Sequence, residues 1–124
     1  MRMQGIVLKK IPIREFDSIV ICYTQTMGKQ IYQAKGALRN YSKQAAHLDV
    51  LNYVEFSVID GRQLPLIISS IAIDTFPSIK KSLPALLVSH FIMEWFDKLV
   101  FSNEEDPILW SKILELMLNI DKKN

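Results

Sequence analysis

Residues 18–36 read SIVICYTQTMGKQIYQAKG, and this stretch decides the class of fold. Its first part alternates, with Ile19, Ile21 and Tyr23 falling on one face, as expected of a strand whose two faces differ. Gly28 then supports a tight turn, because glycine adopts positive φ without a steric penalty. Residues 30–36 return as a further strand. The stretch therefore predicts a β-hairpin.

Further β-rich segments flank this hairpin. Residues 5–13 predict one strand before it, and residues 48–59 and 64–73 predict two after it, joined at Asp60-Gly61, which is a strong hairpin signal. A polar, basic connection at residues 37–47 separates the third strand from the fourth. Five strands with one longer connection match a five-stranded Greek-key barrel of the OB type. Strand count alone does not separate this barrel from a small open sheet.

The apolar period changes after Phe76-Pro77. Apolar residues recur at steps of one, three or four up to Leu99, which indicates a helix, and Ser82 is placed to cap it. Asp106-Pro107 predicts the start of a second helix. The expected fold is an all-β five-stranded OB-fold barrel followed by two α-helices, α+β overall, with a nucleic-acid-binding domain at 1–77 and a partial helical domain at 78–124. The expected helical core includes Trp95, Phe96, Phe101 and Trp110.

Charge divides the chain into two unlike parts. Residues 1–47 hold eight basic and two acidic residues, a net charge of +6, whereas residues 48–124 carry −4. This asymmetry suggests two surfaces with different partners. The alternative is that the charges cluster by chance on a solvated surface. The single cysteine, Cys22, excludes an internal disulfide, and it is expected to pack in the core. Without a signal peptide or a membrane-spanning stretch, the expected location is the cytoplasm.

Several short segments together resemble one known family. Residues 5–8 (GIVL), followed by residues 14–17 (REFD) and by Thr24 and Gly28, are similar to the opening of RecO recombination proteins. Residues 34–37 (AKGA), with Arg39 and residues 42–43 (SK), resemble the basic loop of that family. The helical pattern after Phe76-Pro77 resembles the start of its helical domain. The resemblance extends over nearly the whole chain.

The resemblance implies an N-terminal OB-fold that binds single-stranded and double-stranded DNA, anneals complementary strands and helps to load recombinase. The implied protein partners are RecR and single-strand-binding protein. The family usually runs to about twice this length, so we expect either a truncated chain or a reduced homologue. Many members carry a four-cysteine zinc site in the second half, which this sequence lacks. We therefore expect no metal or other cofactor here.

The candidate DNA-binding residues lie in the basic segment. Lysine and arginine neutralise phosphates, and tyrosine rings stack on bases. The alternative is a solvated basic face with the tyrosines in the core. Phe16, in the first connection, is a further stacking candidate. The candidates are Lys9, Lys10, Arg14, Lys29, Lys35, Arg39 and Lys43, with Tyr32 and Tyr41 for stacking.

The sequence gives no sign of catalytic chemistry. It contains neither a GxxxxGK[ST] phosphate loop nor a GxSxG elbow, and its close acidic groups have no accompanying histidine. The leading hypothesis is a non-enzymatic DNA-binding and annealing module. The alternative is a protein-interaction adaptor that docks a partner on its acidic helical half. The helices carry more apolar surface than a small barrel covers, so we also expect self-association into a homo-oligomer.

Overall fold

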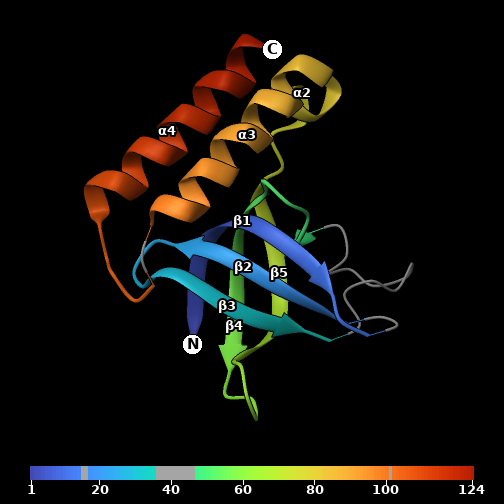
Figure 1. Cartoon of the computed structure of the whole chain (residues 1–124), viewed down its shortest axis with the longest axis vertical. Helices are drawn as coiled ribbons and strands as arrows, with labels where there is room; N and C mark the ends of the chain where they lie inside the picture. The colour runs from blue at the N-terminus through green and yellow to red at the C-terminus, as the bar shows by residue number, and fades with distance from the viewer. Residues whose placement is uncertain (15–16, 36–46, 101) are drawn as a thin grey trace.

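The computed structural model describes residues 1–14, 17–35, 47–100 and 102–124. Figure 1 shows a strand-built body with the helices gathered at one end of it. The strands and helices, in chain order, are β1 (Arg2–Pro12), β2 (Ser18–Thr24), β3 (Gly28–Ala34), β4 (Tyr53–Ile59), β5 (Leu66–Asp74), α2 (Pro77–Lys81), α3 (Leu83–Leu99) and α4 (Pro107–Lys123).

The strands form a closed barrel in the order β1-β2-β3-β5-β4. Neighbouring strands are antiparallel except β3 and β5, which are parallel and meet at Gln33 and Leu66. The barrel closes where β1 pairs with β4, from Arg2 opposite Ser57 to Ile6 opposite Tyr53. This is the five-stranded barrel predicted from the sequence, and the open sheet is excluded.

The β2–β3 hairpin closes as its sequence predicts. Gly28 has φ 64°, in the left-handed region where glycine is unstrained. The Thr24 hydroxyl donates to the Gly28 carbonyl oxygen at 2.7 Å and accepts from the Met27 amide at 3.1 Å. The buried Thr24 hydroxyl therefore makes hydrogen bonds to two backbone groups of the turn, which fixes the register of the two strands.

The barrel interior is filled by the inward faces of the strands. Val7, Val20 and Phe56 are buried there, and the rings of Tyr32 and Phe56 meet edge to face with centroids 5.2 Å apart. Cys22 is also enclosed, as expected, and burial raises the pKa of its thiol to about 12. Such a thiol stays protonated near neutral pH, so it packs as an apolar group.

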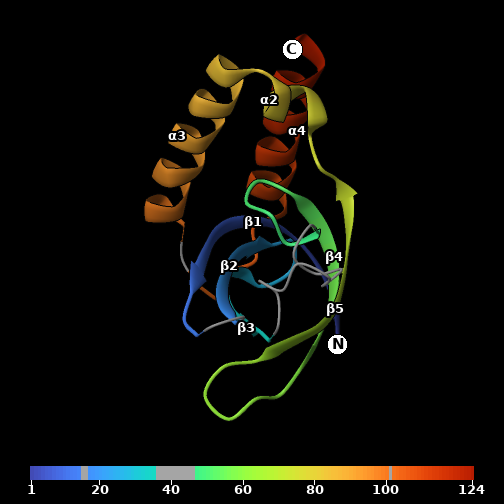
Figure 2. The same cartoon turned by 90° about the vertical axis from the view of Figure 1, so that its right-hand side faces the viewer.

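A second core lies between the outer face of the barrel and the helices. Ile6, Leu8 and Tyr23 face outward from β1 and β2 and join one cluster with Met93 of α3 and Trp110 of α4. The Tyr23 ring packs edge to face on Phe96 at 4.8 Å between centroids and lies 6.0 Å from Trp110. Figures 1 and 2, which differ by a quarter turn, both show α3 and α4 together at one end of the barrel. The domain division at 77/78 stays a prediction.

Two details differ from the sequence-based expectation. The structure has a third helix, α2, which starts at Pro77 after Phe76 turns left-handed with φ 50°. Its five residues are too short for a helical period to appear. In addition, β4 begins at Tyr53 instead of residue 48, because residues 47–52 form turns. Leu48 and Leu51 are buried in these turns. Apolar residues at these positions made the segment look like the start of a strand.

The helix caps and one of the two tryptophans follow the prediction. Ser82 accepts from the Ala85 amide at 3.4 Å and Asp106 accepts from the Leu109 amide at 2.9 Å, so both predicted caps are confirmed. Trp110 is buried in the core. The prediction for Trp95 was wrong, because its side chain is 57% exposed on the outer face of α3. Phe101 lies outside the described residues.

Candidate nucleic-acid interface

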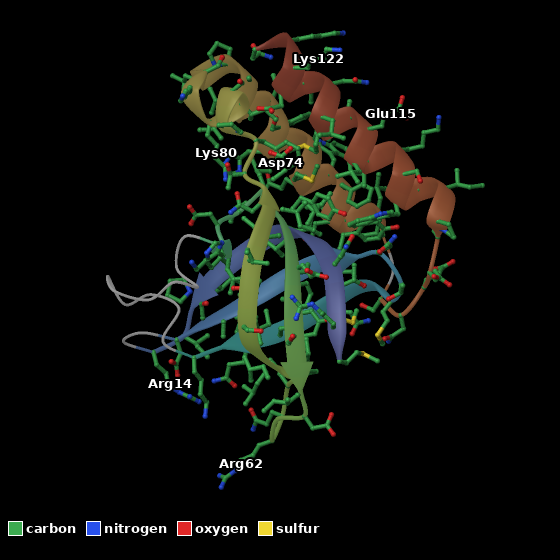
Figure 3. All side chains as sticks on the ribbon, turned by 180° about the vertical axis from the view of Figure 1, so that it is seen from behind. Arg14, Arg62, Asp74, Lys80, Glu115 and Lys122 are labelled. Carbon is green, nitrogen blue, oxygen red and sulfur yellow. The ribbon has the colours of Figure 1, made fainter. Side chains whose placement is uncertain are left out.

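A cleft of about 680 Å³ opens at the end of the barrel remote from the helices. Three separate segments supply its cations: Arg14 follows β1, Lys35 follows β3, and Arg62 lies in the connection between β4 and β5. Figure 3 shows Arg14 and Arg62 at this same end of the molecule. The lining is completed by Gln33, Asp60, Gly61, Gln63 and Leu66.

The barrel topology explains why these three cations meet. In the order β1-β2-β3-β5-β4, the single parallel contact between Gln33 and Leu66 brings the end of β3 beside the start of β5. The backbone N–H of Gln33 donates to the Pro65 carbonyl oxygen at 2.9 Å, which fixes this junction. The first and last connections of an OB barrel, together with strands 2 and 3, form its oligonucleotide-binding surface. Arg14 and Arg62 occupy those two connections.

The charge of the cleft is positive and accessible to solvent. Lys35 and Arg62 are exposed, and Asp60 is the one carboxylate among the described lining residues. Arg14 is 3.4 Å from the Asp17 carboxylate, but its side chain is 65% exposed. An exposed pair of this kind contributes little and is screened by salt. Arg14 therefore remains able to exchange Asp17 for a phosphate.

An aliphatic floor extends from the cleft across the outer face of the first three strands. Ile31 of β3 stands opposite Ile21 of β2, which in turn stands opposite Lys9 of β1, so these side chains share one face. Ile11 and Ile31 are exposed, and Ile19 and Ile21 are half-buried. No exposed aromatic ring is present among the described residues of this floor. It offers bases apolar contact instead of ring stacking.

Lys9 and Lys29 lie at the opposite end of this face, not in the cleft. Both ammonium groups lie 3.2 Å from the Asp97 carboxylate of α3, Lys9 from Oδ2 and Lys29 from Oδ1. Lys10 points elsewhere, as alternation along a strand requires. Burial lowers the pKa of Lys10, while the Asp49 carboxylate raises it. Of the predicted basic residues that the structure describes, Arg14 and Lys35 line the cleft and Lys9 and Lys29 lie beside Asp97. Lys10 lies apart from both groups.

The two predicted stacking tyrosines have different outcomes. Tyr32 is 3% exposed and lies in the barrel interior, where burial raises its pKa. A base cannot reach this ring, so the prediction that Tyr32 stacks on DNA is corrected: alternation along β3 turns it inward. Arg39, Tyr41 and Lys43, together with Phe16, lie outside the described residues.

Sequence reasoning missed Arg62. It lies in the net-acidic part of the chain, directly after Asp60 and Gly61, so the charge count gave it no weight. The available signal was topological, since the β4–β5 connection of an OB barrel borders the binding surface. Gln33 and Gln63 were missed as well, and their amides add hydrogen-bonding groups beside the cations.

The described residues show neither a cluster of metal ligands nor a membrane-spanning helix. In residues 1–14, 17–35, 47–100 and 102–124, no three histidine, cysteine, aspartate or glutamate side chains gather as metal ligands would. Within the same ranges, no helix combines the length and the apolar character that a membrane crossing needs.

The family match and the similar proteins all point to RecO proteins. Residues 1–76 match the family described as Recombination protein O N terminal. The DNA repair protein RecO of Listeria monocytogenes serotype 4a is 27% identical over 121 residues, covering 98% of this chain and 48% of that protein. The DNA repair protein RecO of Acetivibrio thermocellus is 29% identical over 119 residues, covering 96% and 46%.

The matched region and the barrel agree with each other. The family match ends at residue 76, where β5 has finished and α2 is about to begin. The chain spans about half the length of the curated relatives it matches, at 48% and 46% of the two named above. Because the family match covers more than half of the 124 residues, the chain belongs to the RecO family of recombination proteins.

Proposed function

We propose that this chain acts in DNA repair by binding single-stranded DNA in the cleft at the end of the barrel, without catalysis. The observation that carries the proposal is the convergence of Arg14, Lys35 and Arg62 from three segments on one exposed surface. Phosphate neutralisation by such side chains supplies affinity without a base code. The names of the relatives, DNA repair protein RecO, support the biological setting.

Strand annealing follows from the same chemistry. A basic surface that holds the phosphates of two strands lowers their repulsion and leaves the bases free to pair. No covalent bond changes in this reaction, so no catalytic group is needed. Binding of double-stranded DNA, recombinase loading, and partnership with RecR and single-strand-binding protein are part of this proposal through family membership.

Salt dependence is the direct test of DNA binding. If the three cleft cations each neutralise one phosphate of a single strand, log affinity should fall with log salt at a slope of about −2. Further contacts from the rest of the basic segment would steepen the slope to roughly −3 to −4, for four to six phosphates. The measurement is fluorescence anisotropy with a labelled oligonucleotide. A slope near zero, or no binding at low salt, would contradict the proposal.

An adaptor function is the second candidate, because α3 presents an apolar stripe to solvent. Residues four apart on a helix share one face, and Leu87, Phe91 and Trp95 follow this spacing. Beside them, a groove of about 370 Å³ lies between α3 and α4. The exposed members of the surface are Leu83, Leu87, Val88, Phe91, Trp95, Leu99 and Leu116.

The predicted self-association would use this stripe. Seven large apolar side chains exposed beside one another exceed the single, scattered exposures that are normal on a monomer. A second copy would meet the same patch in an isologous contact. Sedimentation over a concentration series should show association of the wild-type chain and a monomer for Trp95→Glu. A wild-type monomer at high concentration would contradict this prediction.

A further inference from the structure

A cluster of three charged side chains closes the helix end of the barrel face. Lys9 comes from β1, Lys29 from β3 and Asp97 from α3. Each carboxylate oxygen of Asp97 lies 3.2 Å from one ammonium nitrogen. The Lys29 ammonium also donates to the Asp97 backbone carbonyl oxygen at 2.8 Å. One carboxylate thus serves two cations, which leaves the cluster with a net positive charge.

The two lysines form a site that requires an anion. They project from the same face of the sheet on either side of β2, and Asp97 brings both ammonium groups to one carboxylate. The attraction of both ammonium groups to this carboxylate offsets the repulsion between them. The present anion belongs to α3 and is largely buried, with its side chain 10% exposed. A phosphate offers oxygen acceptors of the same kind with at least the same charge.

The two lysines are not held equally. Lys29 donates a hydrogen bond to the Asp97 backbone carbonyl oxygen and lies at ion-pair distance from the carboxylate oxygen Oδ1, and its side chain is 23% exposed. Lys9 makes its ion pair with one carboxylate oxygen, and its side chain is 42% exposed. A lysine stem has several rotatable bonds, so its ammonium group can turn outward without any backbone movement. Lys9 is therefore the member that can reach an external anion.

The cluster lies where single-stranded DNA bound in the cleft would pass if it continued along β3. Lys29, Ile31 and Gln33 alternate along β3 and so share its outer face, and Lys35 follows directly after the strand. Lys29 and Lys35 stand roughly 20 Å apart at the rise of an extended strand. Single-stranded DNA held at Lys35 and lying along this face would bring its backbone to Lys9.

We propose that Lys9 and Lys29 form a second phosphate site, which Asp97 occupies in the free protein, and that an incoming phosphate group takes Lys9 from Asp97. The source of the phosphate as DNA rests on the proposed function. The lysine pair itself would also accept a free polyphosphate.

The test removes the internal anion. Asp97→Asn keeps the shape and the oxygen acceptor but not the charge. The affinity for a single-stranded oligonucleotide should rise about three- to tenfold at low salt, and the salt slope should steepen by about 0.7 for one added phosphate. Lys9→Ala should weaken oligonucleotide binding modestly in the wild type, where Asp97 competes for the ammonium group, and should abolish the gain in the Asp97→Asn background. Glu94→Gln, an exposed charge removal on the same helix, is the matched control.

A second measurement uses inorganic triphosphate as the probe, followed through the amide signals of Lys9 and Lys29. Saturable shifts are expected in the wild-type chain, stronger in Asp97→Asn and absent in Lys9→Ala. The wild-type and Lys9→Ala titrations keep the test valid if Asp97→Asn does not fold. Absence of DNA binding with triphosphate binding retained would overturn only the DNA function. No wild-type triphosphate shifts, or an equal gain in Glu94→Gln, would show that Asp97 is a structural ion pair only.

Discussion

Replacing Arg14, Lys35 and Arg62 together by alanine is expected to weaken binding of single-stranded DNA on the order of a hundredfold at 50 mM salt. Each phosphate that a single strand presents to a cation contributes about 0.7 to the salt slope, so the loss of three contacts should flatten it by about 2. The effect should be the same for oligonucleotides of different sequence, because phosphate contacts carry no base information. The three residues line one cleft but come from three segments.

A matched triple substitution separates the cleft from general charge. Lys112, Lys122 and Lys123 are exposed on α4, far along the chain from the barrel, and their replacement by alanine removes the same charge. We expect this control to change affinity by less than about threefold, through long-range attraction alone. Equal losses from the two triple variants would refute the position of the interface.

Replacing Trp110 by alanine is expected to lower the free energy of unfolding by about 3–5 kcal/mol. Trp110 is 5% exposed and lies at the junction of barrel and helices, with its ring 6.0 Å from that of Tyr23 and 5.8 Å from that of Tyr53. Its removal leaves a cavity between two layers that can collapse only in part. Urea denaturation followed by circular dichroism measures this loss.

Trp95→Ala is the control for this substitution. The side chain is 57% exposed on α3, 6.3 Å between ring centroids from Phe91, and it fills no buried space. We expect a loss below about 1 kcal/mol, measured at a concentration where the chain is monomeric. If Trp95→Ala and Trp110→Ala were equally destabilising, our assignment of the interlayer core would be wrong.

The fold was predictable because local chemistry and tertiary structure agree in it. The alternation of residues 18–36, the turn at Gly28 and the Asp60-Gly61 connection each point to strands that the barrel contains. Helix α2 and the turns before β4 were not predictable, because their positions depend on what they pack against. Phe76, with its left-handed backbone, is fully buried by that packing.

The candidate site was less accessible to sequence reasoning, as individual residues show. The sequence shows that positive charge is concentrated in residues 1–47, but not which of these side chains share a surface. In the folded chain Lys35 faces the cleft, Lys29 is bound to Asp97 of α3, and Tyr32 is enclosed. These outcomes depend on which face of β3 each side chain occupies and on where α3 docks.

By itself, the sequence determined the five strands, the two long helices with their caps, and the concentration of positive charge before residue 48. These are properties of neighbours along the chain, fixed by alternation, helical period and capping chemistry. Only the tertiary structure decided that Arg62 joins Arg14, and that Asp97 holds Lys9. Barrel closure and helix docking bring together residues 48 and 88 positions apart, and no local pattern encodes such distances.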